Sequence, residues 1–257
     1  MSDLGDAGRA FLWLTEVGST NDWAKQHAKE DPDILLGATW IVAERQSAGR
    51  GRLGNEWQSV KGNLAASLLF RPHKPAAKCA QLSFVAALAV SDMLAHFAPN
   101  ASIRLKWPND VLAEGGKIAG ILLESETGPD GGANWLVIGI GVNLASSPAG
   151  TELPATSLAE LGVPPPLPFD RRGGGTGAVE YLDGTFAKWY EAWRTGGFAP
   201  VREAWLSRAQ GLGQRIRVRL AKEEFRGVFR DVDDTGALVL GLPGGLERTV
   251  SAGEVFF

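Results

Sequence analysis

Residues 45–54, with the sequence RQSAGRGRLG, form the segment of this chain best suited to chemistry. They set the guanidinium groups of Arg50 and Arg52 on a backbone that three glycines make flexible. Arginine pairs with two phosphate oxygens at once, and glycine lets backbone amides approach the same anion. The pattern is typical of a mobile loop that grips a phosphate, although GRGR also occurs in solvated loops and in RNA-binding tails.

A second candidate lies in residues 136–144, where the even positions are apolar and the odd positions include Gly139, Gly141 and Asn143. In a strand, such alternation gives one packed face and one face almost free of side chains. Glycine weakens a strand, so two on one face indicate that something flat lies against the backbone. Close packing of a helix, or a tight bend, is the alternative.

Two charged residues frame the next candidate. Lys117 opens the expected strand KIAGILLE directly after a glycine turn, which places an ammonium group at the mouth of a sheet. A cation there can neutralise both a carboxylate and a phosphate, or it can be an ordinary lysine at a strand end. Asp110 ends the turn KWPND and could hydrogen-bond within it, hold Lys117, or bind a metal.

The triplet Ser19, Thr20 and Asn21 precedes a run of helix formers, so we expect a helix to begin at Ser19 or Thr20. Such residues usually cap helices. They can also contact a ligand, because a helix start presents hydroxyls and backbone N–H groups together.

Composition limits the function classes. The chain has 257 residues and a net charge of −3, so any anion site must be local and nonspecific nucleic-acid binding is disfavoured. Its single cysteine, Cys79, allows no internal disulfide, and its three histidines lack the spacing of a metal site, so we expect no structural zinc. The first residues lack an export signal, and polar residues interrupt the apolar run 79–98, which predicts a cytoplasmic protein with a buried helix there and no membrane span.

The remaining patterns predict an α+β fold. Strands are expected at 40–44 and 62–70, paired as a hairpin around the cationic loop, and at 101–106, 117–124 and 135–142. Residues 164–177 have the composition of an exposed loop, and a helical stretch follows over about 179–208. Beyond residue 211, period-two segments predict a small antiparallel barrel or sheet, which divides the chain into domains 1–210 and 211–257.

In order and spacing, five of these segments resemble the biotin–protein ligases, also called biotin–[acetyl-CoA-carboxylase] ligases. The resemblance covers residues 12–145 strongly and the C-terminal barrel more loosely. The matching segments are 19–21 (STN), 46–54, 106–110 (KWPND), 117–122 (KIAGIL) and 139–143 (GIGVN).

The resemblance implies a class II synthetase-like catalytic domain, with a mixed central sheet and flanking helices, and a two-step ligation. The biotin carboxylate attacks the α-phosphate of ATP to give biotinyl-adenylate and pyrophosphate. A lysine of a biotin carboxyl carrier domain, from acetyl-CoA carboxylase or a related carboxylase, then displaces AMP. Mg²⁺ is implied as the companion of ATP.

The resemblance also implies residue roles. Ser19, Thr20 and Gln46 would contact the ureido ring, and the loop would close over the adenylate. Lys117, Arg52 and Asp110 would be catalytic: Lys117 would bridge the carboxylate and the α-phosphate, and Asp110 would hold Lys117 or a magnesium-bound phosphate. The two strand glycines, Gly139 and Gly141, would form a wall for the bicyclic ring, Asn143 would lie toward the nucleotide, and Trp57 would cover the adenylate. The full binding set implied in this way comprises Ser19, Thr20, Asn21, Gln46, Gly49, Arg50, Gly51, Arg52, Trp57, Lys117, Gly139, Gly141 and Asn143.

Some features depart from the family pattern. Asn55 and Glu56 stand where further basic residues often follow the loop. Eighteen residues precede Ser19, where the first helix is expected, too few for a winged helix-turn-helix, which predicts a ligase that does not itself repress transcription. Relatives often pair through the central sheet, which leaves a homodimer open.

Two other functions fit parts of the sequence. A lipoate or octanoate ligase or transferase shares the fold and the pocket lysine, but the polar groups of Ser19, Thr20 and Gln46 suit a urea ring better than an apolar tunnel. A noncatalytic RNA-binding or adaptor protein could use the GRGR loop and the terminal barrel, but the negative net charge argues against it.

Overall fold

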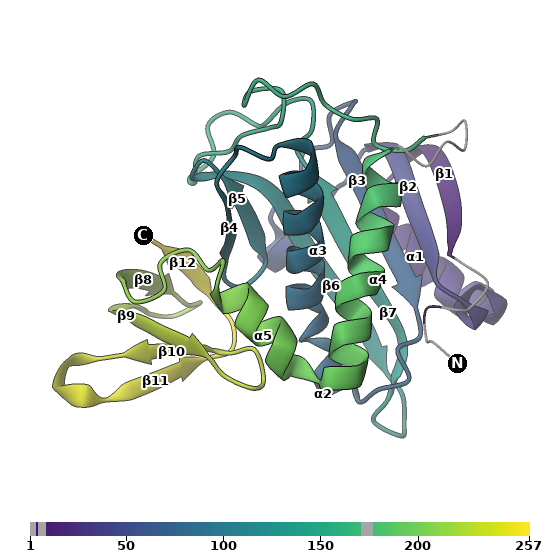
Figure 1. Cartoon of the computed structure of the whole chain (residues 1–257). Coiled ribbons are helices and arrows are strands. Elements are labelled where there is room, and N and C mark those ends of the chain that lie inside the picture. Colours follow the sequence, from purple (N-terminus) through teal and green to yellow (C-terminus); the bar gives the residue numbers. More distant parts are fainter. Residues whose placement is uncertain (1–3, 5–8, 171–176) are drawn as a thin grey trace.

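A seven-stranded mixed sheet forms the centre of the molecule (Figure 1). The computed structural model describes Leu4 and residues 9–170 and 177–257. The first two strands of the sheet pair in parallel and all others pair antiparallel. In spatial order the strands are β1 (Ala10–Val17), β2 (Thr39–Gln46), β3 (Leu64–Phe70), β7 (Ala133–Val142), β6 (Gly116–Thr127), β5 (Asp110–Ala113) and β4 (Ile103–Lys106).

Helices α3 (Leu82–Phe97) and α4 (Ala178–Gly196) cover one face of this sheet (Figure 1). By length and composition alone, residues 76–97 could cross a membrane. Most of α3 is nevertheless buried, in the main core between the sheet and α4. Burial of its apolar side chains is the main stabilising contribution of this helix. The prediction of a buried helix over 79–98 is confirmed.

The opposite face of the sheet is only partly covered. Helix α1 (Thr20–Glu30) packs Ala24 and Ala28 there, in a small core with Ile41, Leu69 and Val137. Beyond α1, the same face carries small residues in register across three strands. They are Ala65 and Ser67 on β3, Gly139 and Gly141 on β7, and Gly120 on β6. A sheet lined in this way leaves room for something above it.

The C-terminal strands form a separate five-stranded antiparallel sheet, which lies beside the β4 edge of the central sheet (Figure 1). Trp107 joins the two sheets, since its Nε1 donates to Gly236 O at 3.0 Å. The strands of the second sheet, in spatial order, are β11 (Glu247–Val250), β10 (Leu238–Gly241), β9 (Glu224–Val232), β8 (Arg215–Arg219) and β12 (Glu254–Phe256).

The predicted α+β fold is confirmed, as are the β2–β3 hairpin and the start of α1. Strands β1 and β5 were not predicted. The single helical stretch expected over 179–208 is two helices, because Gly197 with a φ of 69° breaks it. Of the predicted loop 164–177, residues 171–176 lie outside the described residues. The shorter elements are α2 (Ala76–Cys79), α5 (Phe198–Leu206), η1 (Pro32–Leu36), η2 (Arg52–Gly54) and η3 (Pro243–Gly245).

Candidate active site

A cavity of about 390 Å³ lies over the small-residue part of the sheet. The loop 50–58 and the KWPND turn contribute to its walls, and Gly253, Glu254 and Phe256 of the C-terminal sheet complete them. All but one of the site residues proposed from the sequence line this cavity: Ser19, Thr20, Asn21, Gln46, Arg50, Gly51, Arg52, Trp57, Asp110, Lys117, Gly139, Gly141 and Asn143. The fold therefore brings together segments that are dispersed along the chain.

The exception is Gly49, which packs behind the cavity wall. Its carbonyl accepts from Trp57 N at 2.9 Å. A Cβ at this position would lie 2.4 Å from Trp57 O, closer than side chains approach backbone atoms. Glycine is required here so that the chain can bring Trp57 over the sheet.

One end of the cavity is built from uncharged hydrogen-bonding groups. Ser19 caps α1, since its Oγ accepts from Asp22 N at 3.4 Å. Thr20 directs both its N–H and its hydroxyl toward Gln46 Oε1, at 2.8 and 3.0 Å. These contacts fix the Gln46 amide with its oxygen toward the helix, and its Nε2 lies on the side of Gly49, 3.1 Å from where a Cβ of that residue would be.

Ser67 on β3 extends this network, although sequence analysis did not select it. Its Oγ donates to Asn21 Oδ1 at 2.6 Å and lies 2.7 Å from Thr20 Oγ1. The side chain is fully buried. A hydroxyl within the apolar run LAASLLF was the only signal that could have identified it.

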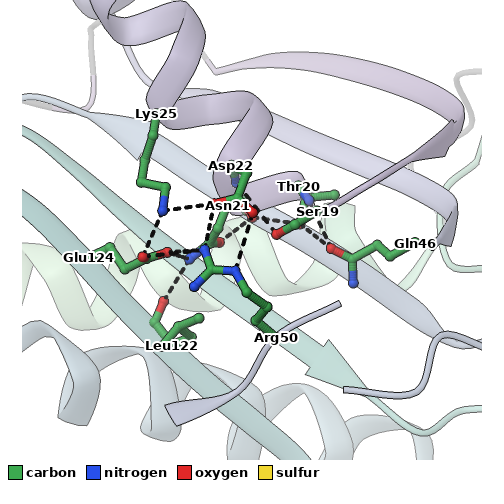
Figure 2. Close-up of polar contacts among 10 residues, drawn as sticks. Ser19, Thr20, Asn21, Asp22, Lys25, Gln46, Arg50, Leu122 and Glu124 are labelled. Carbon is green, nitrogen blue, oxygen red and sulfur yellow. Dashed lines mark hydrogen bonds and ion pairs between the residues drawn. The ribbon is translucent and has the colours of Figure 1, made fainter. Parts of the chain in front are cut away.

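Asn21 and Glu124 connect the network to β6 (Figure 2). Asn21 Nδ2 donates to Glu124 Oε2 at 2.8 Å and to Leu122 O at 3.3 Å. The same amide covers Gly139, where an added Cβ would lie 2.3 Å from Asn21 Oδ1. Glu124 was also missed by sequence reasoning, because a glutamate near the end of an expected strand usually faces solvent.

The two arginines of the loop point in different directions. Arg50 Nη2 lies 2.5 Å from Asp22 Oδ1 and 3.3 Å from Glu124 Oε2 (Figure 2). On the other side, Arg52 Nη1 donates to Asn109 Oδ1 at 3.5 Å. Burial lowers the pKa of Arg52, an effect that the negative charges of Asp110 and Glu254 oppose. The loop thus reaches across the cavity, with one guanidinium group at each side.

The opposite end of the cavity is charged. Asp110 on β5 lies between two lysines, with Lys117 Nζ at 2.7 Å from Oδ1 and Lys106 Nζ at 3.2 Å from Oδ2. Lys106 is almost completely buried. Both carboxylate oxygens are therefore occupied, and the three groups together carry one net positive charge. The KWPND motif suggested Asp110, but the part played by Lys106 was not foreseen.

The glycine wall is covered by Trp57. A Cβ at Gly141 would lie 2.2 Å from Trp57 Cε2, and one at Gly120 would lie 3.1 Å from Trp57 Cζ3. Lys117 Nζ is 5.9 Å from the centre of the indole, within the range of a cation–π contact. The flat group that the strand pattern indicates is thus, in this state, the Trp57 indole over Gly141, with the Asn21 amide over Gly139.

Asn143 is buried at the charged end, where its Nδ2 donates to Thr156 O at 3.1 Å. The contact holds residues 153–157 against the end of β7. As for metals, the described ranges contain no cluster of three or more His, Cys, Asp or Glu side chains able to hold an ion.

Two family models match the chain. Residues 18–143 match the biotin/lipoate A/B protein ligase family, and residues 211–257 match the biotin protein ligase C terminal domain. The chain is 46% identical to a biotin–[acetyl-CoA-carboxylase] ligase of Paracoccus denitrificans, over 95% of this chain and 99% of that protein. This chain belongs to the biotin/lipoate A/B protein ligase family.

Other relatives of the family agree with this assignment. The chain is 34% identical to a biotin–[acetyl-CoA-carboxylase] ligase of Mycobacterium tuberculosis, over 98% of this chain and 90% of the relative. It is 35% identical to the bifunctional ligase/repressor BirA of Bacillus subtilis, over 95% of this chain and 73% of the relative. A biotin protein ligase from Aquifex aeolicus, solved in complex with biotin and ATP, superposes with a TM-score of 0.75 at 27% identity, covering 96% of this chain and 97% of that one.

Proposed function

We propose that the protein is a biotin–protein ligase, which activates biotin with ATP and transfers it to a lysine of a biotin carboxyl carrier domain. The observation that carries this proposal is the cavity itself, which joins an uncharged hydrogen-bonding end to a cationic end. Adenylation of a carboxylic acid needs both, since the acid must be held by its uncharged part while negative charge on the reacting phosphate is neutralised. The names of the relatives agree with this chemistry.

At the uncharged end, the ureido ring of biotin would bind to Ser19, Thr20 and Gln46. A urea offers one carbonyl acceptor and two N–H donors. The NH₂ group of Gln46 suits the carbonyl, because Thr20 already occupies the amide oxygen. The N–H groups of the ring require acceptors, and the hydroxyls of Ser19 and Thr20 can supply them.

At the cationic end, Lys117 would lie between the biotin carboxylate and the α-phosphate. Its ion pair with Asp110 fixes the position of the ammonium group. Lys106 neutralises Asp110 from the other side, so Lys117 keeps its attraction for an anion. Charge held in place before the reaction lowers the barrier for attack of one anion on another.

Closure of the loop would protect the acyl-adenylate from water, with Arg52, Gly49 and Gly51 in the closing segment. Trp57 would leave Gly141 when the ligand enters, so that the bicyclic ring contacts the glycine wall and the indole covers the adenylate. Asn143 would lie toward the nucleotide. Exclusion of water is required because acyl-adenylates hydrolyse readily.

Mg²⁺ would arrive with ATP and shield its phosphates during the displacement. Since Asp110 is engaged by two lysines, the phosphates and water would supply most ligands of the ion. We further propose a cytoplasmic location, a division into domains 1–210 and 211–257, and a carrier from acetyl-CoA carboxylase or a related carboxylase.

The test is incubation of the protein with biotin, labelled ATP and a carrier domain, followed by mass measurement of the carrier. We expect one biotinyl group per carrier and release of labelled AMP. A parallel reaction with lipoate serves as the control for substrate class. Modification by lipoate in preference to biotin, or no modification at all, would overturn the proposal.

A further inference from the structure

A cluster of two acidic and two basic side chains lies beside the uncharged end of the cavity, to whose wall Arg50 contributes (Figure 2). Its members are Asp22 and Lys25 of α1, Arg50 of the loop and Glu124 of β6. Their charges balance. Helix α1, the loop and the central sheet therefore meet at this cluster, and Glu124 is the member that belongs to the sheet.

Glu124 is the member with the most partners. It accepts from Lys25 Nζ at 2.8 Å and from Asn21 Nδ2 at 2.8 Å, and it lies 3.3 Å from Arg50 Nη2. Its side chain is 23% exposed, whereas that of Asp22 is 51% exposed. Solvent and salt therefore screen the interactions of Glu124 less than those of Asp22.

The contact with Asn21 leads into the cavity. Asn21 Oδ1 accepts from Ser67, and Ser67 touches Thr20, which in turn fixes the Gln46 amide. An amide can rotate by half a turn and exchange its oxygen and nitrogen, but Glu124 can accept only from the nitrogen. A carboxylate at position 124 thus sets the direction of the hydrogen bonds along this chain of side chains.

We propose that Glu124 is a positioning residue for the reaction, which fixes the Asn21 amide in the cavity and docks the cationic loop through Arg50. The inference rests on the proposed function. It assigns different roles to the two arginines of the loop. Arg50 anchors the loop to the sheet, while Arg52 faces the reacting groups. Side chains that hold a binding group in its productive geometry affect function without touching the ligand.

The informative substitution is Glu124→Gln, which preserves shape but removes the charge. Lys25 and Arg50 would then repel each other beside Asp22, and the new amide would offer the Asn21 nitrogen a weaker acceptor. We expect the KM for biotin and the release rate of biotinyl-adenylate to rise by about 10-fold, the effect of losing charge-assisted hydrogen bonds. The kcat at saturating biotin should change much less, because the charged end of the cavity is intact.

The matched control is Glu126→Gln. Glu126 lies two residues farther along β6, on the same face, and also pairs with a lysine of α1, since Lys29 Nζ is 3.5 Å from its carboxylate. In the part of the chain that the structure describes, it forms no hydrogen bond or ion pair with Asn21 or Arg50, so wild-type kinetics are expected. Glu124→Asp keeps the charge and should recover part of the loss.

A second measurement needs no substrate. Trypsin cleaves after arginine, and Arg50 and Arg52 lie in the loop, so cleavage of the ligand-free protein reports on docking. Glu124→Gln should speed cleavage at these two sites by several-fold relative to wild type and to Glu126→Gln, with an unchanged melting temperature. Unaltered cleavage and unaltered biotin KM would overturn the proposal, as would equal effects in the control. If the wild-type protein fails to adenylate biotin, the proposed function fails, and the cleavage assay still decides whether Glu124 docks the loop.

Discussion

The two ends of the cavity differ in how they are held together. The end near α1 is an uncharged network that is mostly buried, in which Thr20, Ser67 and Gln46 bind one another through directional hydrogen bonds. The end near β5 has a carboxylate between two ammonium groups, and Lys117 is partly open to solvent. Directional bonds discriminate between shapes, whereas charges stabilise a reaction with little regard to shape. We therefore propose that substrate selection and chemistry belong to separate ends of one cavity.

The largest effect should follow from Lys117→Ala, which removes a positive charge from the charged end of the cavity, near β5. Loss of a preorganised charge typically costs 100-fold or more, so adenylate formation should fall by at least about that factor. Biotin binding in the absence of ATP should weaken much less, because only the carboxylate contact is lost and the contacts of the ureido ring remain. Single-turnover release of pyrophosphate and calorimetry with biotin measure the two properties, and unchanged turnover would refute the role of Lys117.

Arg52→Gly should affect the intermediate more than its formation. The guanidinium group lies over the KWPND turn, where it can cover the adenylate when the loop closes. We expect biotinyl-adenylate to dissociate at least about 10-fold faster, as is usual for loss of a charge-assisted contact. Rapid filtration of the enzyme loaded with labelled intermediate gives the rate, and equal retention by the variant would contradict this role.

Gly141→Ala tests the wall between the two ends. The added methyl group would overlap the Trp57 indole and displace it from the sheet. We expect about 10-fold weaker binding of biotin and of ATP alike, since the wall adjoins both ends. Gly184→Ala in α4, where an added Cβ meets nothing within 4 Å, is the control and should be neutral or slightly stabilising. Calorimetry with each substrate separates the outcomes, and loss confined to one substrate would argue against a shared wall.

Ser67→Ala should affect only the uncharged end of the cavity, near α1. It leaves the Asn21 oxygen and the Thr20 hydroxyl without their common partner. Loss of one buried hydrogen bond typically costs about 1 kcal/mol, so the KM for biotin should rise about 5-fold while the KM for ATP stays constant. A parallel increase in both constants would mean that the two ends are coupled.

The smallest effect concerns pH. Burial raises the pKa of Glu124, but hydrogen bonds from Lys25 and Asn21 and the charges of Lys25 and Arg50 outweigh it, so this pKa is lowered. The pKa of Asp22 is also lowered, because its bonds to Lys25 and Arg50 outweigh its burial. A carboxylate whose pKa is lowered in the folded protein stabilises the docked loop fully at any pH above its pKa in an unfolded chain. It loses this contribution as the pH falls through its pKa in the folded protein. Hydrogen exchange in residues 49–57 should therefore keep constant protection down to about pH 4 and lose it below, and a loss near neutral pH would contradict the ionic anchor.

Sequence analysis selected the residues that line the cavity better than those that hold them in place. Glycine pairs, a lysine after a turn and a capped helix start are conspicuous, so Gly139, Gly141, Lys117 and Ser19 could be selected. Glu124 is an ordinary glutamate in an ordinary strand, and only the tertiary fold brings it to Arg50.

The elements that escaped prediction did so for similar reasons. Strand β5 has four residues between two turn sequences, and its stability comes from its neighbours β4 and β6 rather than from its own pattern. Trp57 was expected in the site, but the sequence of its loop gives no sign that the indole lies on the glycine wall. The indole can lie over Gly141 because the backbone of Trp57 passes close to Gly49. A period-two pattern cannot reveal such a contact.

The spacing of contacts along strand β6 limits the length of the molecule that can fit between the two ends of the cavity. The ammonium of Lys117 lies 3.5 Å from the point where Gly120 would bear a Cβ, and Asn21 binds the carbonyl of Leu122, two residues along the same strand. At the rise of an extended chain, these points are roughly 7 Å apart. The backbone of β6 therefore sets how far apart the Lys117 ammonium and the Asn21 amide are held. We expect an acid whose aliphatic tether is too short or too long to reach one of these groups but not both.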